Sequence, residues 1–220
     1  MTKLIKILVS ISLSLLILFG SFYYVMDWKS FYTYEIKKSN ISEVVGIPEE
    51  DLLPLYMVLT DYMLGRVDSI QLEATVDGVV MPMYNQREID HMVDVKHLTT
   101  LLRNLVTLLF AIIALGVFLL ARKREQFKGV FIGQFITTIG VFLGFIAMAM
   151  TDFNKYFFKF HELLFTNDLW LLNPETDRMI MLLPEVFFRD IVIVIVLAYA
   201  VMSILIGVVG VSYAKNSERR

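Results

Sequence analysis

The chain contains three histidines, His91, His97 and His161, and no cysteine. Histidine can take and return a proton near neutral pH, so each is a candidate general acid or base. Asp94 lies three residues from both His91 and His97, and Glu88 lies three residues before His91, spacings that place side chains on one helical face. The pattern fits a histidine base oriented by a carboxylate, and it also fits a solvated, charged helix end.

The sequence lacks the motifs of several other chemistries. His91 and His97 are about 120° apart around a helix and no H-E-x-x-H motif occurs, so no metal site is expected. The absence of cysteine excludes disulfides, thiolate-ligated metals and a thiol nucleophile. There is also no G-x-S-x-G motif, no H-x-x-x-x-D motif and no glycine-rich phosphate loop. The net charge of −2 gives no support to nucleic-acid binding.

The third histidine, His161, precedes Glu162 and stands among aromatic residues. The pattern suits a catalytic histidine and equally an amphipathic histidine at a membrane interface. Asn167 and Trp170 follow soon after. They can form the floor of a pocket or anchor the chain at the membrane interface.

The apolar residues concentrate in four blocks. Hydrophobic residues make up 57% of the 220 residues and charged residues 19%. About 20 apolar residues of helix cross a bilayer core, so each block is long enough to span a membrane. The first block has a basic start and no small-x-small cleavage motif, which favours an uncleaved signal anchor. The predicted spans are residues 4–26, 104–121, 129–150 and 191–213.

Lysine and arginine predict the orientation of these spans. Nine of them lie at the start of the first span, within the 122–128 turn and after the fourth span, against two acidic residues. The rest of the chain holds 11 Lys and Arg against 20 Asp and Glu. Because cytoplasmic flanks are enriched in Lys and Arg, both termini are expected in the cytoplasm. Residues 27–103 and 151–190 are then expected on the extracytoplasmic side.

The outer segments are expected to form a small α/β lobe. Residues 49–64 have helical apolar spacing, and this helix can lie on the membrane or pack on a sheet. Residues 69–84 contain alternating apolar residues and an Asp77-Gly78 turn, which predicts a two-stranded hairpin. The fold class expected is therefore an α-helical integral membrane protein with four transmembrane helices and a small α/β extracytoplasmic lobe.

Two long helices are expected to carry the histidines. Asn85 and Glu88 resemble a capping box, and no Pro or Gly follows before residue 116, so one helix is predicted from residue 86 through the second span. The third span continues through residue 165 without a breaker. Straight helices would lift His91 and His161 to a similar height, about 16–18 Å beyond the apolar edges.

Two runs then resemble a known family. They are REIDHMVDVKHL and FFKFHELLFTNDLWLLNPETDRMIMLLPE. They look like the signature stretches of the lipoprotein intramolecular transacylase family of four-span bacterial membrane proteins, and the resemblance extends over essentially the whole chain. It implies a bacterial cytoplasmic-membrane enzyme whose substrates are diacylated lipoproteins in membrane lipid. The implied reaction moves the sn-2 acyl chain of the diacylglyceryl-cysteine to the α-amino group of the same cysteine.

The resemblance places the two functional histidines on His91 and His161, with His97 outside the motif core. We expect His91, oriented by Asp94 or Glu88, to act as base and then acid, and His161 to stabilise the oxyanion or position the ester. A competing version has a histidine nucleophile and an acyl-imidazole. Neither version needs a cofactor. Five residues are candidates to support the histidines or bind substrate: Glu88, Asp94, Asn167, Trp170 and Asp177.

Two functions of other classes remain open. The protein can be a non-enzymatic membrane subunit that binds a partner through its outer lobe, with solvated histidines. It can also be an interfacial lipid hydrolase, which would release free fatty acid and form no amide.

Overall fold

The computed structural model describes residues 2–121, 126–149 and 152–218. The chain divides into two compact units, each built from segments that are distant in sequence. We call Met1–Tyr24, Arg103–Asp152 and Val192–Arg220 the membrane unit, and Val25–Leu102 with Phe153–Ile191 the lobe. Three cations of the expected cytoplasmic turn, Arg122, Lys123 and Arg124, lie outside the described residues, as do the terminal Arg219 and Arg220.

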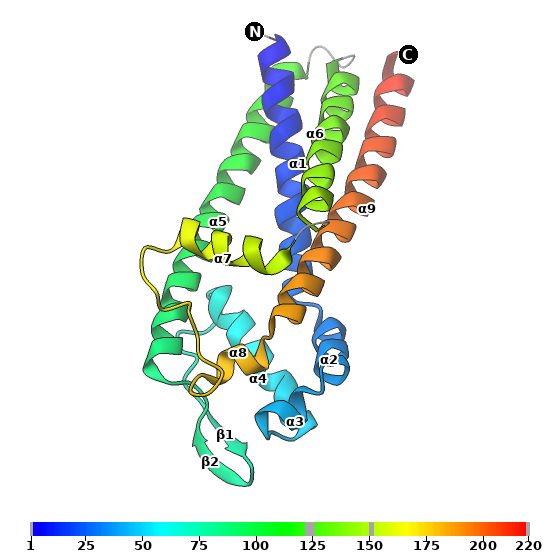
Figure 1. The fold of residues 1–220 in the computed structure, drawn as a ribbon. Helices are drawn as coiled ribbons and strands as arrows, with labels where there is room; N and C mark the ends of the chain where they lie inside the picture. Colours follow the sequence, from blue (N-terminus) through cyan, green and yellow to red (C-terminus); the bar gives the residue numbers. More distant parts are fainter. Residues whose placement is uncertain (1, 122–125, 150–151, 219–220) are drawn as a thin grey trace. The chain divides into compact units, whose positions relative to one another are not determined.

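Four helices of the described residues are long and apolar enough to cross a membrane. They are α1 (Thr2–Met26), α5 (Gln86–Leu120), α6 (Gln126–Ala149) and α9 (Glu185–Glu218) (Figure 1). Large apolar side chains point outward from them, with Phe118 77% and Val209 67% exposed, as expected where lipid is the solvent. The protein is therefore a multi-pass integral membrane protein.

Small and polar side chains join the helices of the membrane unit. The hydroxyl of Ser14 on α1 lies 2.6 Å from the hydroxyl of Tyr199 on α9 and 3.2 Å from that of Thr138 on α6. Ser10 donates a hydrogen bond to the Val130 carbonyl at 2.9 Å, next to Gly133, where an added Cβ would meet the Ser10 hydroxyl at 2.5 Å. Close approach and interhelical hydrogen bonds replace the hydrophobic driving force that is missing in lipid.

The lobe contains short helices and one hairpin. Its elements are α2 (Lys29–Lys38), α3 (Ile41–Val45), α4 (Glu49–Met63), β1 (Glu73–Val76), β2 (Val79–Pro82), the start of α5, α7 (Phe153–Leu164) and α8 (Arg178–Leu182). Helix α4 packs against α2, where Tyr56 meets Tyr32 and Phe187 in an aromatic cluster. The predicted helix is confirmed, and its packing partner among the described elements is a helix and not the sheet.

The hairpin predicted from the Asp77-Gly78 turn is present. β1 pairs with β2 antiparallel, with Val76 opposite Val79. Asp77 and Gly78 both have positive φ, as a two-residue hairpin turn of the favoured twist requires. The Asp77 amide also donates to the Gly46 carbonyl at 2.8 Å, so the turn is tied to the loop between α3 and α4.

Helix α5 runs unbroken for 35 residues, which confirms the continuous helix predicted from residue 86. At about 1.5 Å per residue it exceeds the roughly 30 Å bilayer core, and its first part, through Leu102, belongs to the lobe. Its start is a reciprocal capping box: the Asn85 amide donates to Glu88 at 2.7 Å and the Glu88 amide donates to Asn85 at 3.1 Å.

The predicted continuation of the third span is wrong. Helix α6 ends at Ala149, and a separate helix, α7, begins at Phe153 and runs crosswise to α5 (Figure 1). The sequence holds no Pro or Gly at this boundary. Packing decides the break, because α7 buries His161 and half-buries Phe157 inside the lobe, contacts that outweigh local helix propensity.

Candidate active site

The structure brings His91 and His161 together inside the lobe. His91 stands on the second turn of α5 and His161 near the end of α7, and their ring centroids are 6.2 Å apart. Only 8% of His91 and 9% of His161 is exposed. The two rings are therefore close neighbours, tilted by 38° to each other. The equal-height argument from straight helices fails, because α7 is a separate helix, and the proximity of the two histidines comes from the packing of the lobe.

His161 is held by a backbone carbonyl. Its Nδ1 lies 2.7 Å from the carbonyl oxygen of Phe157, one turn earlier on α7. A carbonyl only accepts hydrogen bonds, so Nδ1 carries the proton and Nε2 presents its lone pair. The ring stacks on Trp170, with centroids 5.0 Å apart, and also contacts Phe157 at 4.4 Å. Burial lowers the pKa of His161, and the bond to Phe157 opposes that shift.

His91 has a different environment. Its Nδ1 is buried and has no hydrogen-bond partner among the described residues. The ring of Phe165 stands edge-on at 5.4 Å. The pKa of His91 falls to about 4, mainly through burial and then through His161, while Asp94 opposes the shift. Both imidazoles are therefore neutral near pH 7, and the buried His91 Nδ1 keeps an unused hydrogen-bonding capacity.

Glu88 does not orient His91. Its side chain is 1% exposed, and its oxygens accept hydrogen bonds from the amides of Asn85 at 2.7 Å and Met179 at 2.6 Å. Burial raises the pKa of Glu88, and the two amide bonds oppose the rise. This carboxylate therefore caps α5 and ties it to α8, across 91 residues of chain.

The side chain of Asp94 has a hydrogen-bond partner other than His91. It accepts a hydrogen bond from the Asn167 side chain at 2.8 Å. Asn167 belongs to the loop that follows α7, and its own carbonyl accepts from the Trp170 indole at 3.0 Å. Arg87 on α5 holds the same loop through the Asp168 carbonyl. Trp170 therefore contacts His161, and Asn167 links Trp170 to Asp94 on α5.

Asp177 lies in a hydrogen-bonded corner between the start of α5 and the segment before α8. It is 3% exposed and accepts bonds from the Asn85 side chain and the Asn173 amide, both at 2.7 Å, and from the Thr176 hydroxyl at 3.0 Å. Burial acts to raise the pKa of Asp177, but these bonds outweigh it and the pKa is lowered. Asp177 joins the segment before α8 to the start of α5.

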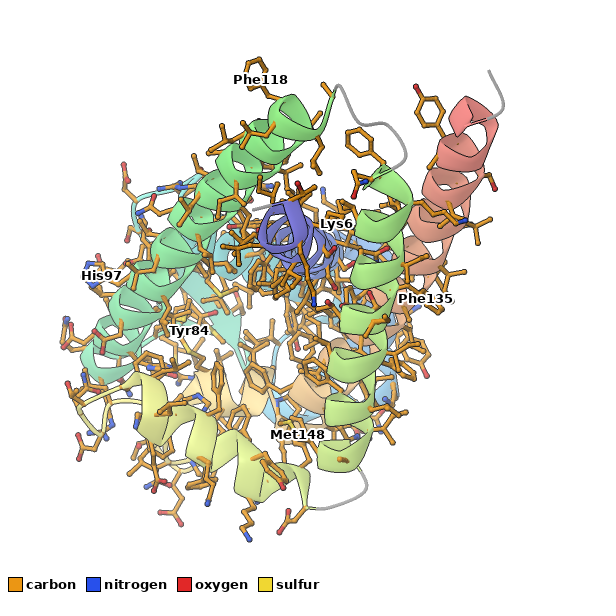
Figure 2. The ribbon with its side chains drawn as sticks, turned by 90° about the horizontal axis from the view of Figure 1, so that it is seen from above. Lys6, Tyr84, His97, Phe118, Phe135 and Met148 are labelled. Carbon is orange, nitrogen blue, oxygen red and sulfur yellow. The ribbon has the colours of Figure 1, made fainter. Side chains whose placement is uncertain are left out.

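His97 is not part of the pair. It is exposed and points outward from α5 (Figure 2). Within the described residues, no group of three His, Asp or Glu side chains lies close enough to hold a metal ion.

Sequence reasoning missed the groups that hold the two histidines. The Phe157 carbonyl orients His161, and the rings of Phe157 and Phe165 enclose the pair. Phe157 and Phe165 lie four residues before and after His161, a helical spacing that was a usable signal.

Comparisons with known proteins identify the family of the chain. Residues 7–188 match the family model "Lipoprotein intramolecular transacylase Lit". A structure of the membrane-integral Lit from Bacillus cereus superposes with a TM-score of 0.83 at 26% identity, covering 100% of this chain and 98% of that chain.

Two variants of the same Bacillus cereus protein, with one histidine replaced by arginine or by alanine, each give a TM-score of 0.79 at 26% identity. They cover 100% of this chain and 94% and 96% of theirs. A comparison with curated proteins found no match. The match of the family model over most of the chain shows that this protein belongs to the lipoprotein intramolecular transacylase family.

Proposed function

We propose that the protein moves the sn-2 acyl chain of a diacylglyceryl-cysteine to the α-amino group of the same cysteine, giving an N-acyl, S-monoacylglyceryl lipoprotein. Family membership supports intramolecular acyl transfer on lipoproteins. The observation that carries the proposal is the pair of neutral, buried histidines with ring centroids 6.2 Å apart. The other supporting feature is the placement of both on a lobe of a multi-pass membrane protein.

The division of roles follows from hydrogen bonding and reverses the expectation from sequence. His161 Nε2, left basic by the Nδ1–H bond to Phe157, takes the proton of the attacking amine and returns it to the leaving glyceryl oxygen. His91, neutral and otherwise without a hydrogen-bond partner at Nδ1, donates its N–H to the oxyanion of the tetrahedral intermediate. One C–N bond forms and one ester C–O bond breaks, with no net change in protons.

The geometry of the substrate lowers the remaining barrier. Nucleophile and ester belong to one molecule, and attack closes a ring of about eight atoms. The α-amino group has a pKa of about 7.7–8.0, so part of it is neutral near pH 7. The role of the lobe is then to hold the two ends together, exclude water and supply one base and one hydrogen-bond donor.

The orientation is part of the proposal. Lys3, Lys6 and Lys128 lie at the same ends of the spans as the other flanking cations, and the lobe segments follow the opposite ends along the chain. The excess of Lys and Arg on cytoplasmic flanks supports cytoplasmic termini and a lobe on the extracytoplasmic face. Mature bacterial lipoproteins carry their lipidated cysteine on that face.

Mass spectrometry of the N-terminal lipopeptide of a co-expressed diacylated lipoprotein tests the reaction. Wild type should leave the acyl mass unchanged and move one chain from ester to amide. His91→Ala and His161→Ala should abolish the transfer, while the exposed His97→Ala should keep it. A lipopeptide that stays diacylglyceryl with a free amine refutes the proposal for that substrate, and loss of one chain without amide formation identifies a hydrolase.

The same samples separate general-base from nucleophilic catalysis. Rapid acid quenching and digestion would reveal an acyl-imidazole as a mass increase on the peptide that carries His91 or His161. Absence of the acyl-imidazole during active turnover supports direct attack by the amine. Accumulation of the acyl-imidazole would show that a histidine acts as a nucleophile and not as a general base.

A further inference from the structure

Helix α7 has an apolar face that the lobe leaves uncovered. Phe160, Leu163 and Leu164 are 54%, 84% and 38% exposed. At about 100° per residue they fall within an arc of roughly 100° on the helix surface. The exposed Lys159 borders this arc on one side, and the buried His161 borders it on the other. We call Phe160, Leu163 and Leu164 the α7 face.

Chain connectivity places the start of α7 close to the end of a membrane-spanning helix. Helix α6 ends at Ala149 and α7 begins at Phe153, so four Cα–Cα steps separate them. At about 3.8 Å per step, the start of α7 lies no more than about 15 Å from the last residue of α6. Because α6 is one of the four spans, α7 begins at the boundary between lipid and water.

We propose that α7 is an interfacial helix whose face of Phe160, Leu163 and Leu164 inserts into the acyl region of the bilayer. Outside this face Phe158 is also 45% exposed, with its ring 5.4 Å from that of Trp170, and the other exposed positions are polar. A short helix with an apolar arc and charged residues around it is the form that binds at a lipid surface. Lys159 at the edge of the arc suits the phosphate level, as lysines at interfaces extend their charge toward headgroups. The occupant of the α7 face is therefore lipid.

Insertion of α7 sets the depth in the membrane of His161, the proposed catalytic base. His161 follows Phe160 directly and lies about 100° from it around the helix. An interfacial helix buries its apolar face about 5–10 Å into the boundary between headgroups and acyl chains. His161 then stands at the level of the glyceryl esters, so the α7 face delivers the base to its substrate bond. This step rests on the proposed function, whereas the insertion of α7 does not.

The absence of cysteine makes the proposal testable by site-directed spin labelling. Leu163→Cys and Phe160→Cys report on the α7 face, and Glu162→Cys, about 160° away from Phe160 around the helix, is the matched control. Each labelled chain is reconstituted in phospholipid nanodiscs, and relaxation by oxygen is compared with relaxation by a water-soluble nickel chelate. Two exposed positions on one face keep the test valid if one variant folds poorly.

Labels at positions 160 and 163 should collide readily with oxygen and weakly with nickel, and the label at 162 should show the reverse. Strong nickel accessibility at both 160 and 163 would overturn the proposal. Protection of both from oxygen and nickel would also overturn it, because a protein surface would then cover the face. Lipid-embedded labels in a chain that forms no amide would refute the proposed function alone.

Discussion

The structural role of Glu88 gives a prediction with a defined magnitude. In Glu88→Gln the side-chain oxygen still accepts one hydrogen bond, but its nitrogen cannot accept the second. Either the Asn85 amide or the buried Met179 amide then loses its acceptor. A buried, unpaired N–H costs about 1–3 kcal/mol. For a chain of this length each kcal/mol lowers the melting temperature by about 2–4 °C, so we expect a fall of about 2–12 °C.

The assay can be specific to the lobe. Trp28 and Trp170 are the two tryptophans, and both belong to the lobe. Thermal scans of intrinsic fluorescence in detergent, at one fixed scan rate, therefore follow the unfolding of the unit that contains the site. Glu50→Gln, the same change at an exposed position on α4, is the control and should melt like wild type. The rate of acyl transfer at 25 °C should stay near wild type in both variants.

The opposite pattern would refute the reasoning. An unchanged melting temperature together with a large loss of rate in Glu88→Gln would show that the carboxylate acts on His91. The sequence-based expectation of a Glu88-oriented base would then be restored.

Three further predictions concern pH, the hairpin and the spans. The pKa of His91 is about 4 and that of His161 is also lowered, so both rings are neutral above pH 6.5. The rate of acyl transfer should therefore rise with pH as the substrate amine deprotonates near pH 7.7–8.0. A rate that does not change between pH 6 and pH 8 would contradict this. Gly46→Ala should lower the fluorescence melting temperature, because Gly46 has φ +68° and an added Cβ would lie 2.4 Å from Asp77 Oδ1; a wild-type melting temperature would show that the turn adapts. Tyr199→Phe removes a 2.6 Å hydrogen bond to Ser14 and should weaken resistance to unfolding in dodecyl sulfate by about 0.6 kcal/mol without changing acyl transfer; loss of transfer would give this hydroxyl a role in the reaction.

Local signals predicted most of the fold. Four apolar blocks, the helical spacing of residues 49–64, the Asp77-Gly78 turn and the Asn85–Glu88 capping box each act within a few residues, and each is present in the structure. The break between α6 and α7 was not predictable in this way, because it depends on what α7 packs against and no breaker residue marks it.

The candidate site shows the same limit. Sequence identified both histidines as candidates, and the structure places their rings in one buried pair. The sequence could not identify the backbone amide of Met179 as a partner of Glu88, nor the carbonyl of Phe157 that orients His161. Main-chain groups carry no signature in the sequence, so carboxylates near a histidine were assigned to it by proximity alone.

The division of the lobe into two chain segments also bears on biosynthesis. The segments Val25–Leu102 and Phe153–Ile191 are separated by residues of the membrane unit, so His161 leaves the ribosome 70 residues after His91. At about 5–20 residues per second this interval lasts roughly 4–14 s. Throughout it, Glu88 lacks the Met179 amide and His91 lacks its partner ring. With the two-histidine mechanism proposed above, the nascent chain is inert during synthesis and becomes able to act on lipids only after α6 has been made and α7 has packed against the start of α5.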